Sequence, residues 1–446
     1  MPRGAQRGGV RGAAGADLGG DRVADGGGGT VTEAGDQPGP GALEGVRVVE
    51  LCDELGMFAG KLLADMGAEV VKVEPPEGDR TRTYPPFVDD EPGPERSLFF
   101  WHYNTSKAGV TLDLGAAADR ERLRTLIDRA DILLQSGEAG AELEYESLRE
   151  TNEGLIMVTL SPFGRGMPRE DEASTDLTIL AGGGPVWNCG YDDHSLPPVR
   201  GGGNQGYHTA SHYAVMSALV ALLYRDETGQ GQHIDVNAHA AANVTTEAGT
   251  YTWLVAQETV QRQTGRHAGV NPSMPSQVLC SDGRYVNTGI PPRRPESFGA
   301  VCEWLRTTGL AEEFLEFPLL EEGMRRERFD MSMLQQDEEL MAIFGAGREA
   351  MNFLASRLTS YEFFTGGQER GFQIGIIYSP EEVLEDPHFI ARGFPVEVEH
   401  PELERTVTYP GAPYQFEASP WRIRRRAPLL GEDNERVFAE LAGDGG

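Results

Sequence analysis

Two histidines, His208 and His212, stand four residues apart in a stretch of helical periodicity, so one helix face would carry both imidazoles. Such a pair can bind a metal, but no acidic residue completes an H-E-x-x-H pattern, and we expect no metal site. The four cysteines are far apart and form no C-x-x-C pair. This spacing predicts buried free thiols in a reducing compartment rather than zinc ligands or a redox couple.

A glycine-rich run, Gly201–Gly206, matches the G-x-G-x-x-G pattern of a phosphate-binding loop and precedes a predicted helix. That function requires a strand directly before the loop, whereas Pro197–Arg200 stands there. We expect these glycines instead to let the backbone pass close to another segment or a ligand. The sequence contains no G-x-S-x-G elbow, Walker loop or kinase motif.

The elements that must position these residues alternate between strands and helices. The apolar patterns predict strands at 46–51, 69–73, 110–114, 132–134, 155–160 and 233–236, and helices at 57–66, 116–129, 140–148 and 208–224. Strands that alternate with helices predict an α/β fold with a mainly parallel sheet covered on both faces.

The composition divides the chain into four predicted parts. These are a disordered, glycine- and alanine-rich tail (1–40), the N-terminal part of a large domain (41–240), a smaller central domain (241–372) and a C-terminal return to the large domain (373–446). A start assigned too far upstream is the alternative explanation of the tail. In the last part we expect strands at 374–378 and 396–399.

The charge balance excludes some partners. There are 70 acidic and 39 basic residues, for a formal net charge of -31, so nucleic acid is not an expected partner. Three lysines occur, Lys61, Lys72 and Lys107, and this scarcity beside high acidity indicates a salt-adapted or GC-rich source. No run is long and apolar enough for a membrane span or a signal peptide, and we expect a cytoplasmic protein.

Several phrases, in order along the chain, resemble family III coenzyme A transferases, also called the carnitine dehydratase and bile acid inducible family. They are Leu43–Leu51, Phe58–Pro76, Asn104–Leu114, Arg225–Gln232 before Ile234-Asp-Val, Asp282–Val286, Glu382–Pro387 and Ala427–Glu432. The resemblance covers residues from about 43 to 440. Ordered phrases of this length are far more specific than a single motif.

The resemblance implies a Rossmann-like large domain built from both chain ends, a smaller central domain and an interlocked dimer. It also implies coenzyme A, as acyl-CoA substrate, together with a small organic acid and no metal. In the family, an aspartate carboxylate attacks the thioester to give a mixed anhydride, and CoA then forms an enzyme-bound thioester before the acid takes it.

The position that the resemblance assigns to this aspartate carries Tyr207. A phenol with a pKa of about 10 is mostly neutral at pH 7 and cannot form the acyl anhydride. The catalytic group is therefore unknown from the sequence. Neighbouring His208 as acid or base, and Asp192 or Asp193 moving in from the preceding loop, are the alternatives.

The resemblance places CoA contacts at Leu112 and Asp113, where the sequence keeps the family pattern, and at Ser136 and Gly137, where it does not. In that second segment Glu138 occupies an often basic position, and a carboxylate repels phosphate.

Loss of both the nucleophilic aspartate and the family's CoA-loop residues predicts a non-catalytic subunit that works in a heteromer with an Asp-bearing homologue. The alternatives are an active CoA transferase, as a homodimer or otherwise, or an acyl-CoA isomerase or racemase that uses an unrecognised group. A third is a binding protein that sequesters acyl-CoA without turnover.

Overall fold

The computed structural model describes residues 39–443 except 138–142, 247, 331–332 and 335. The predicted tail, apart from residues 39 and 40, and Glu138 of the predicted CoA loop lie outside the described residues.

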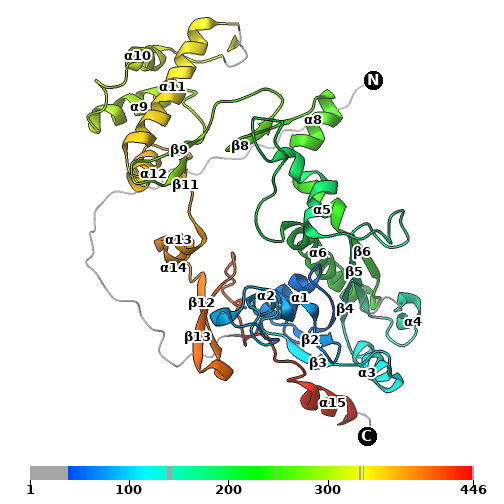
Figure 1. Ribbon diagram of the computed structural model, residues 1–446. Helices are drawn as coiled ribbons and strands as arrows, with labels where there is room; N and C mark the ends of the chain where they lie inside the picture. Colours follow the sequence, from blue (N-terminus) through cyan, green and yellow to red (C-terminus); the bar gives the residue numbers. More distant parts are fainter. Residues whose placement is uncertain (1–38, 138–142, 247, 331–332, 335, 444–446) are drawn as a thin grey trace, which may run out of the picture. The chain divides into compact units, whose positions relative to one another are not determined.

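A six-stranded parallel sheet forms the first layer of the fold, in the order β3-β2-β1-β4-β5-β6 (Figure 1). The strands are β1 (Arg47–Leu51), β2 (Glu69–Glu74), β3 (Ala108–Thr111), β4 (Ile132–Ser136), β5 (Ile156–Ser161) and β6 (His233–Asn237). This arrangement confirms the predicted α/β fold, and the strand order reverses between β1 and β4.

Helices cover both faces of this sheet, because the strands are apolar on both sides. On one face, alternate residues such as Val48 and Ile132 pack with α1 (Met57–Asp65) and α6 (Gln205–Thr228). On the other face, Val49 and Leu133 lie in a core to which α3 (Ala117–Asp128) and α15 (Asn434–Gly443) contribute. Short helices α2 (Leu98–Tyr103), α4 (Tyr145–Arg149) and α5 (Asp176–Gly183) complete this part.

The middle of the chain has a core of its own, built around side chains such as Phe298, Trp304 and Leu354. Helix α7 (Ala238–Asn243) still packs into the core of the large sheet. The elements that follow it are α8 (Ala248–Ala256), β7 (Gln261–Gln263), β8 (Arg266–Gly269), β9 (Gln277–Leu279), β10 (Tyr285–Asn287), α9 (Pro295–Thr307), α10 (Phe317–Arg325), α11 (Glu338–Arg357) and α12 (Ser360–Glu369). The predicted division into a large and a central domain stays a prediction.

The C-terminal strands do not join the six-stranded sheet. The one predicted at 374–378 is β11 (Gly375–Ile376), which pairs with β10 because Ile374 is buried in the middle core. The one predicted at 396–399 is β12 (Pro395–His400), paired with β13 (Arg405–Pro410) after α13 (Pro380–Glu385) and α14 (Pro387–Ala391). The chain then returns to the large sheet, where Asp433 and Asn434 accept hydrogen bonds from the backbone of β3.

A buried ion cluster lies inside the first part of the fold. Glu50 of β1 is completely buried, with Lys72 Nζ 3.4 Å from Oε1 and Lys107 Nζ 2.7 Å from Oε2. Gly60 of α1 faces this carboxylate so closely that an added Cβ would overlap Glu50 Oε2.

Among the described helices, none is long and apolar enough to cross a membrane.

Replacing Gly60 with alanine should therefore destabilise the protein by at least about 3 kcal/mol, because the buried carboxylate must move away from its ammonium partners. Gly345→Ala is the matched control, since its Cβ would meet nothing within 4 Å in α11. It should be neutral or stabilising by up to about 1 kcal/mol. Urea unfolding measures both, and equal values for the two variants would contradict this account of the cluster.

Candidate active site

The carboxyl ends of β1 and β4 meet at the reversal of strand order, where open α/β sheets bind ligands. Asp53 follows β1, and its Oδ1 accepts a hydrogen bond of 2.6 Å from Ser136 Oγ at the end of β4. The amide of Asp53 donates back to Ser136 Oγ at 3.1 Å. Gly137, which follows Ser136, has a φ of +65°, and a side chain there would overlap the Asp53 carboxylate. The candidate site begins with this contact.

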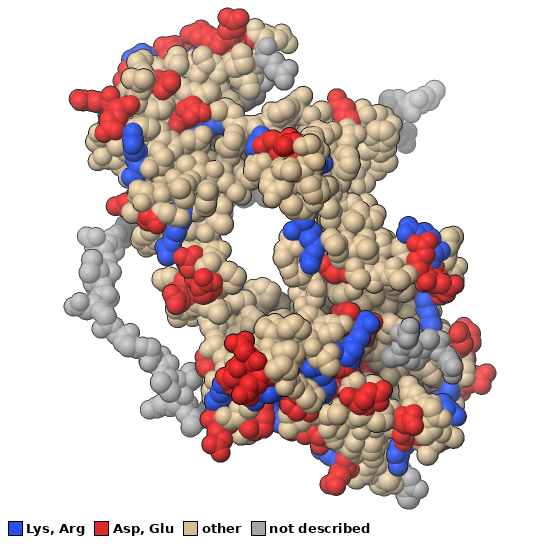
Figure 2. All heavy atoms as spheres, in the orientation of Figure 1, with Lys and Arg blue, Asp and Glu red and all other residues tan. Residues whose placement is uncertain are grey.

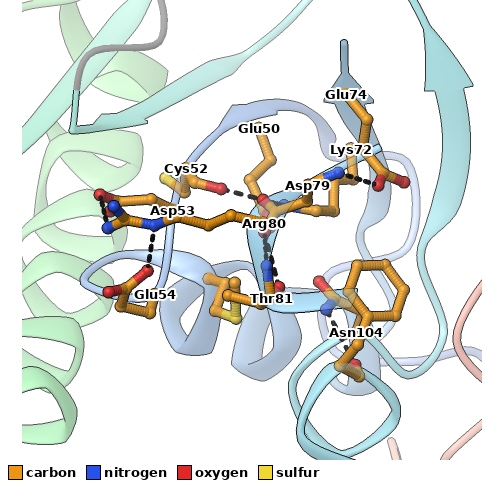
Figure 3. A network of polar contacts seen from close by, with 12 residues as sticks. Glu50, Cys52, Asp53, Glu54, Lys72, Glu74, Asp79, Arg80, Thr81 and Asn104 are labelled. Atoms are coloured by element: carbon orange, nitrogen blue, oxygen red, sulfur yellow. Dashed lines mark hydrogen bonds and ion pairs between the residues drawn. The ribbon is translucent and has the colours of Figure 1, made fainter. Parts of the chain in front are cut away.

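Arg80 bridges two carboxylates at this edge (Figure 3). Its Nε lies 2.8 Å from Glu54 Oε2 and its Nη2 lies 3.3 Å from Asp53 Oδ2. The Arg80 side chain is 61% exposed, so the ion pairs are on the solvent side of the site. Below them, Lys72 Nζ donates to the carbonyl of Cys52 and so holds the end of β1. Both carboxylates of the edge are thus occupied by partners within the chain.

A third carboxylate, Asp176, organises the start of α6. Its Oδ1 accepts hydrogen bonds from the amides of Gly206 at 2.8 Å and Tyr207 at 3.2 Å, and Arg200 Nη1 lies 3.3 Å from Oδ2. A carboxylate is favourable here because the first amides of a helix lack intrahelical acceptors. Asp176 is buried and engaged on both oxygens, so it acts as a cap for the helix.

Tyr207 is buried at the head of α6. Burial raises the pKa of its phenol to about 12, and the negative charges of Glu54 and Asp53 add to the shift. The phenol is consequently neutral at pH 7 and is a poor nucleophile. Asp53 links the predicted positions 207 and 136, because it contacts Ser136 directly and its charge acts on the Tyr207 phenol.

His208 faces away from that neighbourhood, toward α1 and α2. Its Nε2 is 2.7 Å from the hydroxyl of Tyr103, and its ring stacks on Phe58 at a centroid distance of 4.3 Å. His212 meets the same Phe58 ring edge-on at 5.5 Å. Burial, with a contribution from His212, lowers the pKa of His208 to about 4, so this imidazole is neutral near pH 7.

The other predicted contact positions, Leu112 and Asp113, lie at the end of β3. Leu112 is buried, and the exposed Asp113 accepts a hydrogen bond from the amide of Gly115 at 2.9 Å. Since β3 and β4 are three strand spacings apart, these positions are about 14 Å from Ser136.

The two loop acids that were alternatives for the nucleophile are engaged elsewhere. Asp192 forms an ion pair of 2.8 Å with Arg266, and Asp193 accepts hydrogen bonds from the amide and hydroxyl of Ser195.

Comparison with known proteins identifies the family of this chain. The model of CoA-transferase family III matches residues 43–434. The chain belongs to CoA-transferase family III.

Curated relatives of this family III chain are CoA-transferases. The succinyl-CoA:(R)-benzylsuccinate CoA-transferase subunit BbsE of Thauera aromatica is 31% identical over 398 residues, which covers 88% of this chain and 93% of the relative. The succinyl-CoA:mesaconate CoA-transferase of Haloarcula hispanica is 28% identical, with 90% and 96% covered. Among solved structures, a CAIB/BAIF family protein from Brucella suis superposes with a TM-score of 0.72 at 25% identity, covering 90% of this chain and 100% of that chain.

Sequence reasoning missed Asp53, Glu54, Arg80 and Asp176. The first two carried a usable signal, because they directly follow the first strand of a βαβ unit. Arg80 and Asp176 carried none, since their roles depend on partners that are distant in the sequence.

The low pKa of His208 predicts a pH dependence of stability. The unfolded imidazole, with a pKa of about 6.5, binds a proton more readily than the folded one. Stability should therefore fall as the pH drops from about 6.5 to 4, by no more than about 3 kcal/mol from this group. The His208→Gln variant should show a flatter profile in urea unfolding. An NMR titration that placed the pKa of His208 near 6.5 would refute the prediction.

Proposed function

We propose that this chain is the subunit of a two-subunit CoA-transferase that lacks the acyl-accepting carboxylate. Its partner would be a homologue with aspartate at the position of Tyr207. The complex would act on an acyl-CoA thioester and a small organic acid. The observation that carries the proposal is the neutral, buried phenol of Tyr207 at the head of α6.

The state of the neighbouring carboxylates supports this proposal. A nucleophilic carboxylate needs an oxygen that is free to attack the thioester carbon. Asp53 and Glu54 are held by Arg80, and Asp176 by two backbone amides and Arg200. These contacts stabilise the negative charge of each carboxylate and so make it a weaker nucleophile.

The charge at the edge of the sheet gives a second argument. Coenzyme A carries a pyrophosphate and a 3′-phosphate, which favour basic surroundings. Among the described residues at the ends of β1 and β4, Asp53 and Glu54 face this edge with Arg80, which is already paired with both of them, while Asp79 is paired with the buried Lys72. An acidic edge is unfavourable for CoA and suits a chain whose partner holds the coenzyme.

The outer face of α6 supports a second subunit. Its inner face packs alanines into the core, yet four apolar residues along the outside are roughly half or more exposed: Met216, Val220, Leu223 and Tyr224. A helix that is apolar all round is normally buried on all sides. A stripe of this kind fits a protein partner better than it fits water. The name of the relative from Thauera aromatica describes that protein as a subunit.

The chain alone should not transfer CoA from succinyl-CoA to organic acids, whereas the complex with the Asp-bearing homologue should. In the complex, Tyr207→Phe should leave kcat within about twofold, because the hydroxyl takes no part in acyl transfer. Replacing the partner's aspartate with asparagine should lower kcat by about a thousandfold or more. Chromatographic assay of the CoA esters measures all three, and transfer by the chain alone would overturn the proposal.

The same assay separates the alternatives. An isomerase or racemase would convert one acyl-CoA without an acceptor acid. A sequestering protein would bind acyl-CoA in calorimetry without the partner.

Disrupting the outer face of α6 should weaken the complex. Val220→Asp places a charge in the apolar stripe and should raise the Kd for the partner by at least about thirtyfold. Leu315→Asp is the matched control, because Leu315 is 87% exposed and lies outside α6. Its Kd should be unchanged in calorimetry. Equal affinities for both variants would place the partner elsewhere.

A further inference from the structure

We propose that the folded chain withholds all of its lysine amines from solvent and therefore resists acylation at lysine by the activated acyl groups handled around it. The benefit of this property rests on the proposed function, because an acyl anhydride in a bound partner would react with nearby amines. The property itself follows from the contacts of Lys61, Lys72 and Lys107, the lysines of the sequence.

Lys61 and Lys72 are held in buried ion pairs. Lys61 is 5% exposed, with Nζ 2.7 Å from Asp65 Oδ2 and 2.6 Å from Thr105 Oγ1. Lys72 is completely buried and has three acceptors: the carbonyl of Cys52 at 2.9 Å, Asp79 Oδ2 at 3.0 Å and Glu50 Oε1 at 3.4 Å. Its carboxylate partners raise the pKa of Lys72 in spite of its burial, so the amine stays protonated.

Lys107 is also completely buried, with two hydrogen-bond acceptors and one ion-pair partner. Its Nζ donates to the carbonyl of Met57 at 2.9 Å and to Asn104 Oδ1 at 2.8 Å, and lies 2.7 Å from Glu50 Oε2. Acylation requires that the lone pair of the deprotonated amine reach the acyl carbon of the reagent, and complete burial among these partners prevents that contact. Burial lowers the pKa of Lys107 to about 8, so protonation protects this amine less than it protects Lys72, and lack of access is its main protection.

Arginine supplies the basic surface. The three lysines are buried, so the blue side chains on the face seen in Figure 2 are essentially arginine. A guanidinium remains protonated in proteins and has no free lone pair for attack on a thioester or anhydride. The exposed ion pairs of the surface therefore present no amine nucleophile.

The avoided reaction is an acyl transfer to nitrogen. The lysine nitrogen would form an amide bond with the acyl carbon, the carbon–sulfur bond of the thioester would break, and the amine proton would leave with the thiol. The product is uncharged, so each acylation would remove a positive charge. At Lys72 it would remove the ammonium that holds the end of β1 directly below Asp53.

The test is site-resolved acetylation of the full chain with acetic anhydride, followed by peptide mass spectrometry. Hydroxylamine treatment first removes thioesters at the exposed Cys189 and esters at tyrosines. The positive control is Arg169→Lys, which introduces one amine at a side chain that is 57% exposed. Arg149→Lys, at a 53% exposed side chain, repeats the control on another element.

We expect Lys61, Lys72 and Lys107 to be acetylated at least about thirtyfold more slowly than the introduced lysine in the folded chain, because they react only after local opening. In urea the rates should be equal. A smaller ratio for any of the three lysines overturns the proposal. This experiment needs no enzymatic activity, so its failure is distinct from failure of the proposed function.

A second measurement tests whether the buried lysines escape acylation during turnover of the complex. Incubation of the two-subunit enzyme with succinyl-CoA should leave the native lysines unmodified and should succinylate the introduced Lys at position 169. Succinylation of a native lysine overturns the proposal.

Discussion

The hydrogen bonds from the amides of Gly206 and Tyr207 to Asp176 fix the start of α6, and with it the residue at the position that the family resemblance assigns to the nucleophile. Helix amides without partners need an acceptor, and here a buried carboxylate provides it. The same contact has a consequence for chemistry. Asp176, the carboxylate that contacts the head of α6, accepts hydrogen bonds from the backbone, while a neutral phenol occupies position 207.

Buried ion pairs hold the carboxyl edge of the sheet beneath the candidate site. Glu50 binds two ammonium groups, and Lys72 ties that cluster to the end of β1 through Cys52. Such pairs cost desolvation and persist where every donor has an acceptor. The edge above them carries more carboxylates than cations among the described residues, which links the fold of this chain to the proposal that a partner provides the CoA site.

Much of the fold could be predicted from the sequence, because strands buried on both faces read as apolar runs and helices separate them. The strand at 374–378 was predicted within the C-terminal return to the large domain, whereas it pairs with β10, because two residues of pairing leave no periodic signal and the deciding contact is the burial of Ile374. The candidate site could be predicted only in part. Tyr207 and Ser136 came from the family resemblance, whereas the bridge from Arg80 to Asp53 joins residues whose proximity depends on the tertiary fold.

The most direct test of the central claim traps the acyl-enzyme intermediate in the two-subunit complex. After incubation with succinyl-CoA and hydroxylamine, mass spectrometry of each polypeptide locates the modified carboxylate. The account predicts a hydroxamate on the aspartate of the partner and none on Asp53, Glu54 or Asp176 of this chain. A hydroxamate on any carboxylate of this chain would contradict it.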